Sequence, residues 1–259
     1  MKRDLSKHAL ISDAMEGLRP SLIASLPRAL ERLKKTGSFR NKNPKPHKSS
    51  AERFHYMVFQ SAEKVVTDFK TLENIISMVK RIPTRRTFMK WNFTADKWLE
   101  YQYTLYLVTM VGVIDRCLML INAILLLGLD EQDCKEGIIL RHHRIKGTKY
   151  ELAFKRLMQE VKPLRTNRNL DVHRKDLPPF YEILECEEYD WWPLYAQVNK
   201  DGETLIPPEL LQKGFRVAGQ MLASKMQKGR TKLKYRVWRI FDLLAPAARK
   251  KLATLSYTR

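Results

Sequence analysis

Cysteine, glycine and acidic residues are scarce in this chain of 259 residues, and each scarcity narrows the class of protein. The three cysteines have no C-x-x-C or C-x-x-H spacing, so we expect free thiols in a reducing compartment, without a disulfide framework or a zinc knuckle. Ten glycines are few for a turn-rich β-sandwich or a propeller. The 28 acidic residues face 48 Lys and Arg, and the net charge of +20 favours nucleic acid, anionic lipid or an acidic protein as partner.

Sequence motifs of the common enzyme classes are also absent. The chain has no G-x-x-x-x-G-K-[ST], G-x-G-x-x-G, G-x-S-x-G or H-E-x-x-H, so nothing indicates a nucleoside triphosphatase, a dinucleotide enzyme, an α/β hydrolase or a zincin. No paired aspartate array suggests a two-metal nuclease. If this basic protein cuts nucleic acid, we therefore expect it to do so without a metal or another cofactor.

The most apolar run, residues 105–129, carries Asp115 and Arg116 near its centre. One charged residue at mid-bilayer costs about 2.5 to 3.5 kcal/mol on insertion scales, so the two favour a buried helix of a soluble protein over a membrane span. The N-terminal region lacks the uninterrupted apolar stretch of a signal peptide. We therefore expect a cytoplasmic protein that is not inserted in a membrane.

Hydrophobic periodicity predicts an all-α protein, a helical bundle with basic helical extensions at both ends. Its central helix should begin after Thr94, as N-cap, and stop at Gly128; at about 1.5 Å per residue it would be roughly 50 Å long. Other helices are expected at residues 9–35, 51–78, 134–141, 148–172, 209–228 and 231–255. The segments between them are a basic linker at 37–50, a basic interruption at 80–92 and a long loop at 176–208. One hairpin is expected near residue 200.

These elements group into three parts along the chain. A basic helical segment with its linker occupies residues 1–50, and a helical core follows at 51–180. Residues 181–259 hold an acidic, tryptophan-containing loop and C-terminal basic helices. We expect the three parts to form one compact unit.

Residues 162–175, KPLRTNRNLDVHRK, concentrate the side chains that a metal-free phosphodiester reaction needs. The guanidinium of Arg168 stays charged and binds phosphate oxygens, whereas the imidazole of His173, whose ordinary pKa is near 6.5, can move protons at neutral pH. On a helix these two side chains are about 140° apart, so they can border one groove without touching. Further basic residues that could hold nucleic acid surround them: Arg165, Arg174 and Lys175.

The run from Arg168 to His173, with Asn169 directly after the arginine, resembles the R-x4-6-H signature of the HEPN superfamily. The resemblance covers about residues 95–180. It implies a compact α-helical bundle, frequently dimeric, and in many members a metal-independent endoribonuclease of toxin–antitoxin, antiphage or RNA-processing systems. It also implies that Arg168 and His173 act in catalysis and that Asn169 serves their orientation.

On this hypothesis the partner is RNA, and its own 2′-hydroxyl attacks the adjacent phosphate, leaving a 2′,3′-cyclic phosphate and a 5′-hydroxyl. His173 acts as general acid or base, and Arg168 stabilises charge on the phosphate. We expect a homodimer in which the two Arg168 to His173 segments face one another across a twofold axis. A separate interpretation is an interaction module that is regulated by a partner protein, an antitoxin or a nucleotidyltransferase.

Other interpretations of these residues stay open. The motif is short, so a surface arginine and histidine on a basic helix can match it by chance. Arg40 and His47, seven positions apart, also match R-x4-6-H in the basic linker. A helical RNA or DNA binder without catalysis would grip phosphates with Arg-rich loops at residues 42–48, 80–86 and 225–239.

Three residues outside the motif are weaker candidates. Arg141 and Arg144 flank two histidines and either bind phosphate or belong to a solvated turn. Asp115, buried by pattern, either positions the catalytic Arg168 or His173 from a neighbouring helix or pairs locally with Arg116.

Overall fold

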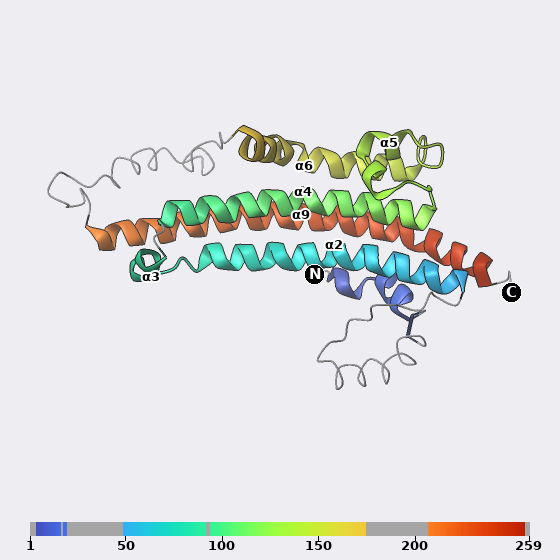
Figure 1. The fold of residues 1–259 in the computed structure, drawn as a ribbon, viewed down its shortest axis with the longest axis horizontal. Coiled ribbons are helices and arrows are strands. Elements are labelled where there is room, and N and C mark those ends of the chain that lie inside the picture. Colours follow the sequence, from blue (N-terminus) through green and yellow to red (C-terminus); the bar gives the residue numbers. More distant parts are fainter. Residues whose placement is uncertain (1–3, 17, 20–48, 92–93, 175–206, 257–259) are drawn as a thin grey trace. The chain divides into compact units, whose positions relative to one another are not determined.

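The computed structural model describes residues 4–16, 18–19, 49–91, 94–174 and 207–256, and every regular element in these ranges is helical (Figure 1). The predicted all-α class, with one long apolar helix, is confirmed. The hairpin expected near residue 200, most of the linker at 37–50 and most of the loop at 176–208 lie outside the described residues.

Three of the predicted helices are found almost where the sequence places them. The elements are η1 (Leu5–Lys7), α2 (Ser50–Lys80), α3 (Arg85–Lys90), α4 (Ala95–Leu125), η2 (Glu131–Asp133), α5 (Glu136–Arg141), α6 (Lys149–Arg174) and α9 (Pro208–Ser256), and residues 9–16 are also helical. Helices α2, α4 and α6 match the predictions at 51–78, 94–128 and 148–172. Side-chain oxygens cap two of them, because Ser49 Oγ accepts the Glu52 N–H at 3.1 Å and Thr148 Oγ1 accepts the Tyr150 N–H at 3.2 Å.

Two predictions about helix boundaries are wrong. The basic interruption contains the short helix α3, which starts after Pro83 where Thr84 Oγ1 accepts the Thr87 N–H at 3.4 Å. The two expected C-terminal helices are one helix, α9, of 49 residues. The helix continues through Gly229, where Tyr106 packs closely against α9. A Cβ at position 229 would lie 2.5 Å from Tyr106 Oη, so this position requires glycine for packing.

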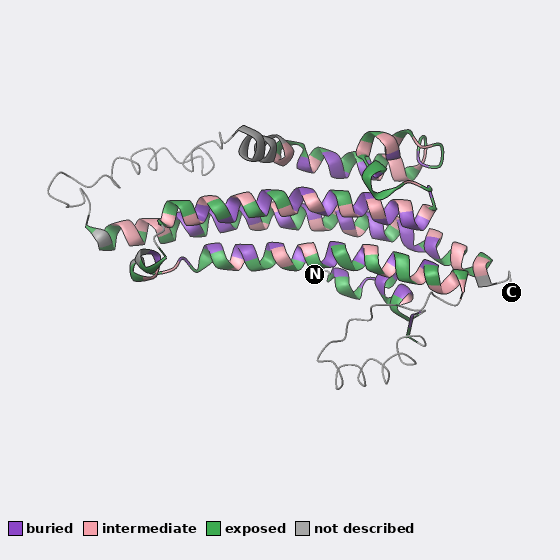
Figure 2. Cartoon of the chain, in the orientation of Figure 1, coloured by how far each residue is buried: buried purple, intermediate pink, exposed green. Residues whose placement is uncertain are grey.

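By contacts the chain divides into two compact units, and α2, α4, α6 and α9 each contribute one part to each unit. Unit 1 comprises Met1–Thr67, Ile114–Arg156 and Arg236–Arg259; unit 2 comprises Asp68–Val113 and Leu157–Tyr235. The division of the chain near residues 50 and 180 stays a prediction. On α2, α4 and α9, buried positions alternate with exposed ones at helical spacing (Figure 2).

Unit 1 is fastened by its N-terminal segment. His8 is buried, with Nε2 at 3.0 Å from Asp242 Oδ1 of α9, and its Nδ1 accepts the Leu10 N–H at 3.1 Å. Because Nδ1 is an acceptor, the proton of the neutral ring lies on Nε2 and is donated to the carboxylate. The ring also packs edge-on against Trp238 and Phe241, with centroids 4.7 and 5.3 Å away.

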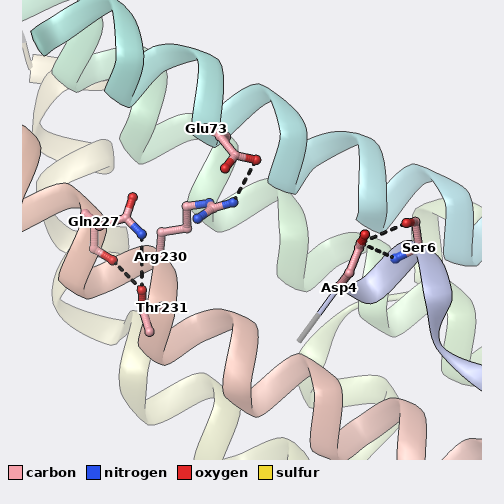
Figure 3. A network of polar contacts seen from close by, with 6 residues as sticks. All are labelled: Asp4, Ser6, Glu73, Gln227, Arg230 and Thr231. Atoms are coloured by element: carbon pink, nitrogen blue, oxygen red, sulfur yellow. Dashed lines mark hydrogen bonds and ion pairs between the residues drawn. The ribbon is translucent and has the colours of Figure 1, made fainter. Parts of the chain in front are cut away.

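Unit 2 is built where α2, α4 and α9 contact one another. Burial raises the pKa of Tyr106 on α4 far above its ordinary value, so its hydroxyl stays protonated and donates to the Met226 carbonyl of α9 at 2.9 Å. The guanidinium of Arg230, also on α9, reaches Glu73 of α2 at 3.0 Å (Figure 3). These contacts order both helices against α9 through polar groups as well as apolar packing.

The C-terminus of α4 ends differently from the prediction. Leu126, with φ of 50°, takes the left-handed position that the sequence assigns to Gly128, and the Leu127 N–H donates to the Asn122 carbonyl at 3.2 Å. This 6→1 bond is that of a Schellman motif. The Asn122 side chain then holds the following loop, because it exchanges two hydrogen bonds with the backbone of Leu129.

Among the described helices, α4 is long and apolar enough to cross a membrane by length and composition. In the structure 61% of its most apolar window is buried. One face of α4 is exposed, and it includes Tyr101, Leu105, Val108 and Asp115. The expectation that Asp115 is buried is therefore wrong, because the apolar pattern around it hides a solvent-facing stripe.

The cysteines within the described ranges, Cys117 and Cys134, are buried and form no disulfide with one another. Burial raises the pKa of the Cys134 thiol, so this group stays protonated at neutral pH. Cys186 lies outside the described residues.

Candidate nucleic-acid interface

The predicted catalytic segment forms the last turns of α6. Residues 168 to 174 are helical, which agrees with the expectation that Arg168 and His173 lie on a helix, but their side chains and that of Asn169 lie outside what the structure describes. Lys175 lies outside it altogether. Arg165 is half-buried and engaged in contacts. The catalytic assignment and that of Arg174 therefore stay predictions.

Backbone geometry adds one relation to that segment. Positions 169 and 173 are four residues apart on a helix, so they lie on the same face, whereas position 168 lies roughly 100° away from 169. The orienting role that the HEPN resemblance implies for Asn169 stays a prediction.

The guanidiniums of Arg141 and Arg144 both have structural partners. Arg144 Nη1 donates to the carbonyls of Leu125 and Leu126 at 2.9 and 3.0 Å, so it caps the C-terminus of α4. Arg141 Nε donates to the Gly137 carbonyl within α5 at 2.7 Å. Although both residues are exposed, these bonds favour the solvated turn over a phosphate grip.

The two histidines between these arginines lie in that turn. The rings of His142 and His143 stack with centroids 4.4 Å apart, and His142 Nδ1 accepts the Arg144 N–H at 3.2 Å. Within the described ranges no group of three or more His, Cys, Asp and Glu side chains lies close enough to share a metal ion.

Basic charge gathers on α9, which carries twelve Lys and Arg against two acidic residues, a net +10 within the chain's +20. Lys225, Lys228 and Lys232 are all exposed, and we call them the lysine stripe. Their spacing of three and four residues keeps them within about 60° of one face of the helix. The opposite face carries buried residues of unit 2: Leu222, Met226 and Leu233. The prediction that residues 225–239 form a loop is wrong, because this basic segment is the middle of a helix.

Aromatic rings gather where α3 meets α4, also in unit 2. Phe88 is buried, whereas Trp91 is 55% exposed, and we call Phe88, Trp91 and Trp98 the tryptophan cluster. The Trp91 ring centroid lies 6.3 Å from that of Phe88 and 6.1 Å from that of Trp98. The basic segment 80–90 precedes this large exposed ring in the sequence, and Lys90 is its direct neighbour in the chain.

A small hollow that is partly open to solvent lies in unit 1 between residues 9–16, α2 and α9. Arg249 Nε donates to Asp13 Oδ2 at 2.7 Å at this hollow, and His55 Nδ1 is buried without a partner among the described residues. The remaining lining is apolar: Leu10, Ala14, Phe54, Val58, Ala248 and Leu252. The hollow is too small for a nucleotide, so we assign no substrate to it.

The surroundings of His55 predict a pH dependence of stability. Burial lowers its pKa below the ordinary 6.5, an effect that Asp13 opposes only in part. At a pH between the lowered pKa of the folded state and the ordinary 6.5 of the unfolded state, the unfolded chain holds a proton at His55 that the folded chain lacks. The free energy of unfolding should therefore fall as the pH drops below about 6.5. Urea unfolding at pH 7.5 and pH 5.5 should show a smaller loss for His55→Phe than for the wild type, and an equal loss would contradict this assignment.

Sequence reasoning missed His55 and the role of Trp91. The surroundings of His55 depend on the contact between Asp13 and Arg249, which are distant in the sequence. The position of Trp91 depends on α3, a helix that the sequence did not predict. The available signal for Trp91 was a tryptophan directly after five Lys and Arg without an acidic residue between positions 80 and 91.

Comparisons with protein-family models, curated proteins and solved structures find no match for this chain. The HEPN resemblance therefore rests on the motif at Arg168 to His173.

Proposed function

We propose that this chain binds RNA through the basic face of α9 and cleaves the bound RNA without a metal ion. Arg168 and His173 are the catalytic residues in this proposal. The observation that carries the binding part is the lysine stripe, an exposed basic face on a helix with a net charge of +10. Such a face attracts a polyphosphate chain and releases its counterions on binding. Arg230 is excluded from it, because that side chain is buried and paired with Glu73.

The cleavage part rests on the chemistry of the motif. His173 removes the proton of the 2′-hydroxyl or delivers one to the departing 5′-oxygen, and Arg168 stabilises charge on the phosphate. The products are a 2′,3′-cyclic phosphate and a 5′-hydroxyl. The helical backbone through residues 168 to 173 supports this proposal, because it sets the two positions about 140° apart, where both can border one bound strand.

The proposed setting is a cytoplasmic toxin–antitoxin or antiphage system. A single motif offers one imidazole, whereas the reaction uses both a base and an acid, so we propose a homodimer that brings two motifs into one cleft. An antitoxin or a nucleotidyltransferase would restrain such an enzyme. The genes adjacent to the coding sequence test this setting directly.

A binding protein without catalysis is the second candidate, and the lysine stripe favours it equally, since binding phosphates does not require the motif. Labelled RNA incubated in EDTA separates the two candidates. Cleavage that leaves a cyclic phosphate supports the ribonuclease. RNA that is bound in a salt-dependent manner, yet stays intact after long incubation, supports the binder.

Removing the charges of the lysine stripe should weaken RNA binding. In the triple variant Lys225→Gln, Lys228→Gln, Lys232→Gln, we expect at least a tenfold loss of affinity at 0.1 M salt. The plot of log K against log salt should become less steep, with the magnitude of its slope smaller by about 2. Each of the three lost phosphate contacts removes about 0.7 from this magnitude on a single strand. Fluorescence anisotropy with 2′-O-methyl RNA, which lacks the attacking hydroxyl, measures binding without cleavage.

A matched variant controls for net charge. Lys64, Lys70 and Lys135 are exposed and lie off α9, so their replacement by Gln removes the same three charges from other surfaces. Affinity close to that of the wild type is expected for this control. Equal losses in both triple variants would mean that binding follows overall charge and not the stripe.

A further inference from the structure

We propose that the tryptophan cluster binds an unpaired base of the RNA by stacking it on Trp91, which makes single-stranded RNA the substrate class. This inference rests on the proposed RNA binding and adds a second contact to it. It is carried by the exposed, braced ring of Trp91 and by the basic segment in front of it.

Trp91 is held in place from two sides. Its backbone N–H donates to the carbonyls of Thr87 and Phe88, at 3.2 and 3.1 Å, so the residue continues the last turn of α3. Its ring is braced by Phe88, at an interplanar angle of 79°, and by Trp98, at 33°. A fixed ring loses little conformational entropy on binding, and 55% of this residue remains exposed for a ligand.

Exposed basic residues precede this ring in the chain. Lys80, Arg81, Arg86 and Lys90 are exposed, and none of them forms an ion pair with another described residue. Arg86 and Lys90 are four residues apart on α3, so they project from the same face of this helix. A stacked base brings phosphates on both of its sides, which these cations can neutralise.

The chemistry favours a single strand over other anionic partners. In a duplex each base is already stacked on its neighbours, so its face is not available to Trp91. A membrane surface also attracts tryptophan and lysine, so vesicles of anionic lipid serve as a further probe in the test.

The test combines two substitutions with two oligonucleotides. Trp91→Leu keeps an apolar side chain but removes the aromatic face, whereas Trp91→Phe keeps a face. The probes are a 15-nucleotide 2′-O-methyl uridine strand and the same strand with abasic sites throughout. We expect Trp91→Leu to bind the uridine strand roughly fivefold or more weakly than the wild type, with Trp91→Phe between them. All three proteins should bind the abasic strand equally.

The outcomes distinguish a failure of base stacking on Trp91 from a failure of RNA binding as a whole. If the wild type binds neither strand, RNA binding itself fails. If the wild type binds the uridine strand and Trp91→Leu binds it equally well, only the stacking site is overturned. A loss in Trp91→Leu that is equal on the abasic strand, or one that appears only with vesicles containing anionic lipid, also overturns stacking. Circular dichroism and thermal unfolding establish that each variant keeps the wild-type fold.

Discussion

Replacing His173 or Arg168 by alanine should lower the rate of RNA cleavage in EDTA by about 10²- to 10³-fold. Loss of a general acid or base costs about 10²- to 10⁴-fold in rate, and loss of one charge-stabilising donor costs about 10²- to 10³-fold. The measurement is the initial rate on 5′-labelled single-stranded RNA, with the cyclic phosphate product identified by mass spectrometry. Affinity for 2′-O-methyl RNA should change much less, because α9 carries most of the binding charge in this proposal.

Arg156→Ala serves as the matched control, because Arg156 is an exposed arginine that lies earlier on the same helix. Its cleavage rate should stay within about twofold of the wild type, as expected for a surface residue away from the reacting groups. Cleavage that requires magnesium, or that survives both active-site substitutions, removes the metal-independent mechanism and leaves the binding protein as the better description.

The shared cleft has its own consequence for these two inactive proteins. When Arg168→Ala and His173→Ala chains are mixed and allowed to exchange, a heterodimer combines defects from different motifs, so partial recovery of cleavage supports a composite site. Light scattering under the same conditions gives the mass of the active species. A fully active species with the monomer mass of 30.5 kDa would exclude the dimer.

Gly219→Val should be the most destabilising single change that we predict. A Cβ at position 219 of α9 would lie 2.7 Å from the Val79 carbonyl oxygen and 2.7 Å from Ile82 Cδ1. The first of these atoms belongs to the backbone of α2, so α9 must move away from its neighbour. We expect a loss of about 3 kcal/mol in the free energy of unfolding, and a melting temperature lower by roughly 6 to 12 °C.

Gly112→Val tests whether that loss comes from the close approach and not from replacing a helical glycine. Gly112 lies on α4 in the same unit, and a Cβ there would meet only Asp68 Oδ2, at an ordinary 3.9 Å. Valine also has a somewhat higher helix propensity than glycine, so we expect a change within about 0.5 kcal/mol. Similar losses in both variants would place the cost in the helices themselves.

Periodicity and caps predicted most of the fold, because α2, α4 and α6 each show a repeating apolar face and a marked start. Two features depend on tertiary contacts and could not be predicted. Gly229 looks like a helix stop in the sequence, yet Tyr106 of α4 packs where its side chain would be. The end of α4 was misplaced for a related reason, because Arg144 stabilises the carbonyls of Leu125 and Leu126 before Gly128 is reached.

The candidate interface was less predictable than the fold. Net charge predicted a polyanion partner, but only the continuous α9 shows that Lys225, Lys228 and Lys232 share one exposed face. Asp115 lies in so apolar a segment that the pattern predicts its burial, although the helix exposes it. Patterns of spacing indicate which residues share a face, but which face is covered depends on the neighbours.

The order of contacts has a consequence for synthesis on the ribosome. His8 meets Asp242, 234 residues later, and Tyr106 meets Met226, 120 residues later. The contact surfaces of α2 and α4 therefore lack their α9 partner until the C-terminal helix has been translated, roughly 7 to 26 seconds after the end of α4 at about 5 to 20 residues per second. During this interval the apolar faces of α2 and α4 are open to aggregation, and a prematurely terminated chain lacks part of the core of both units.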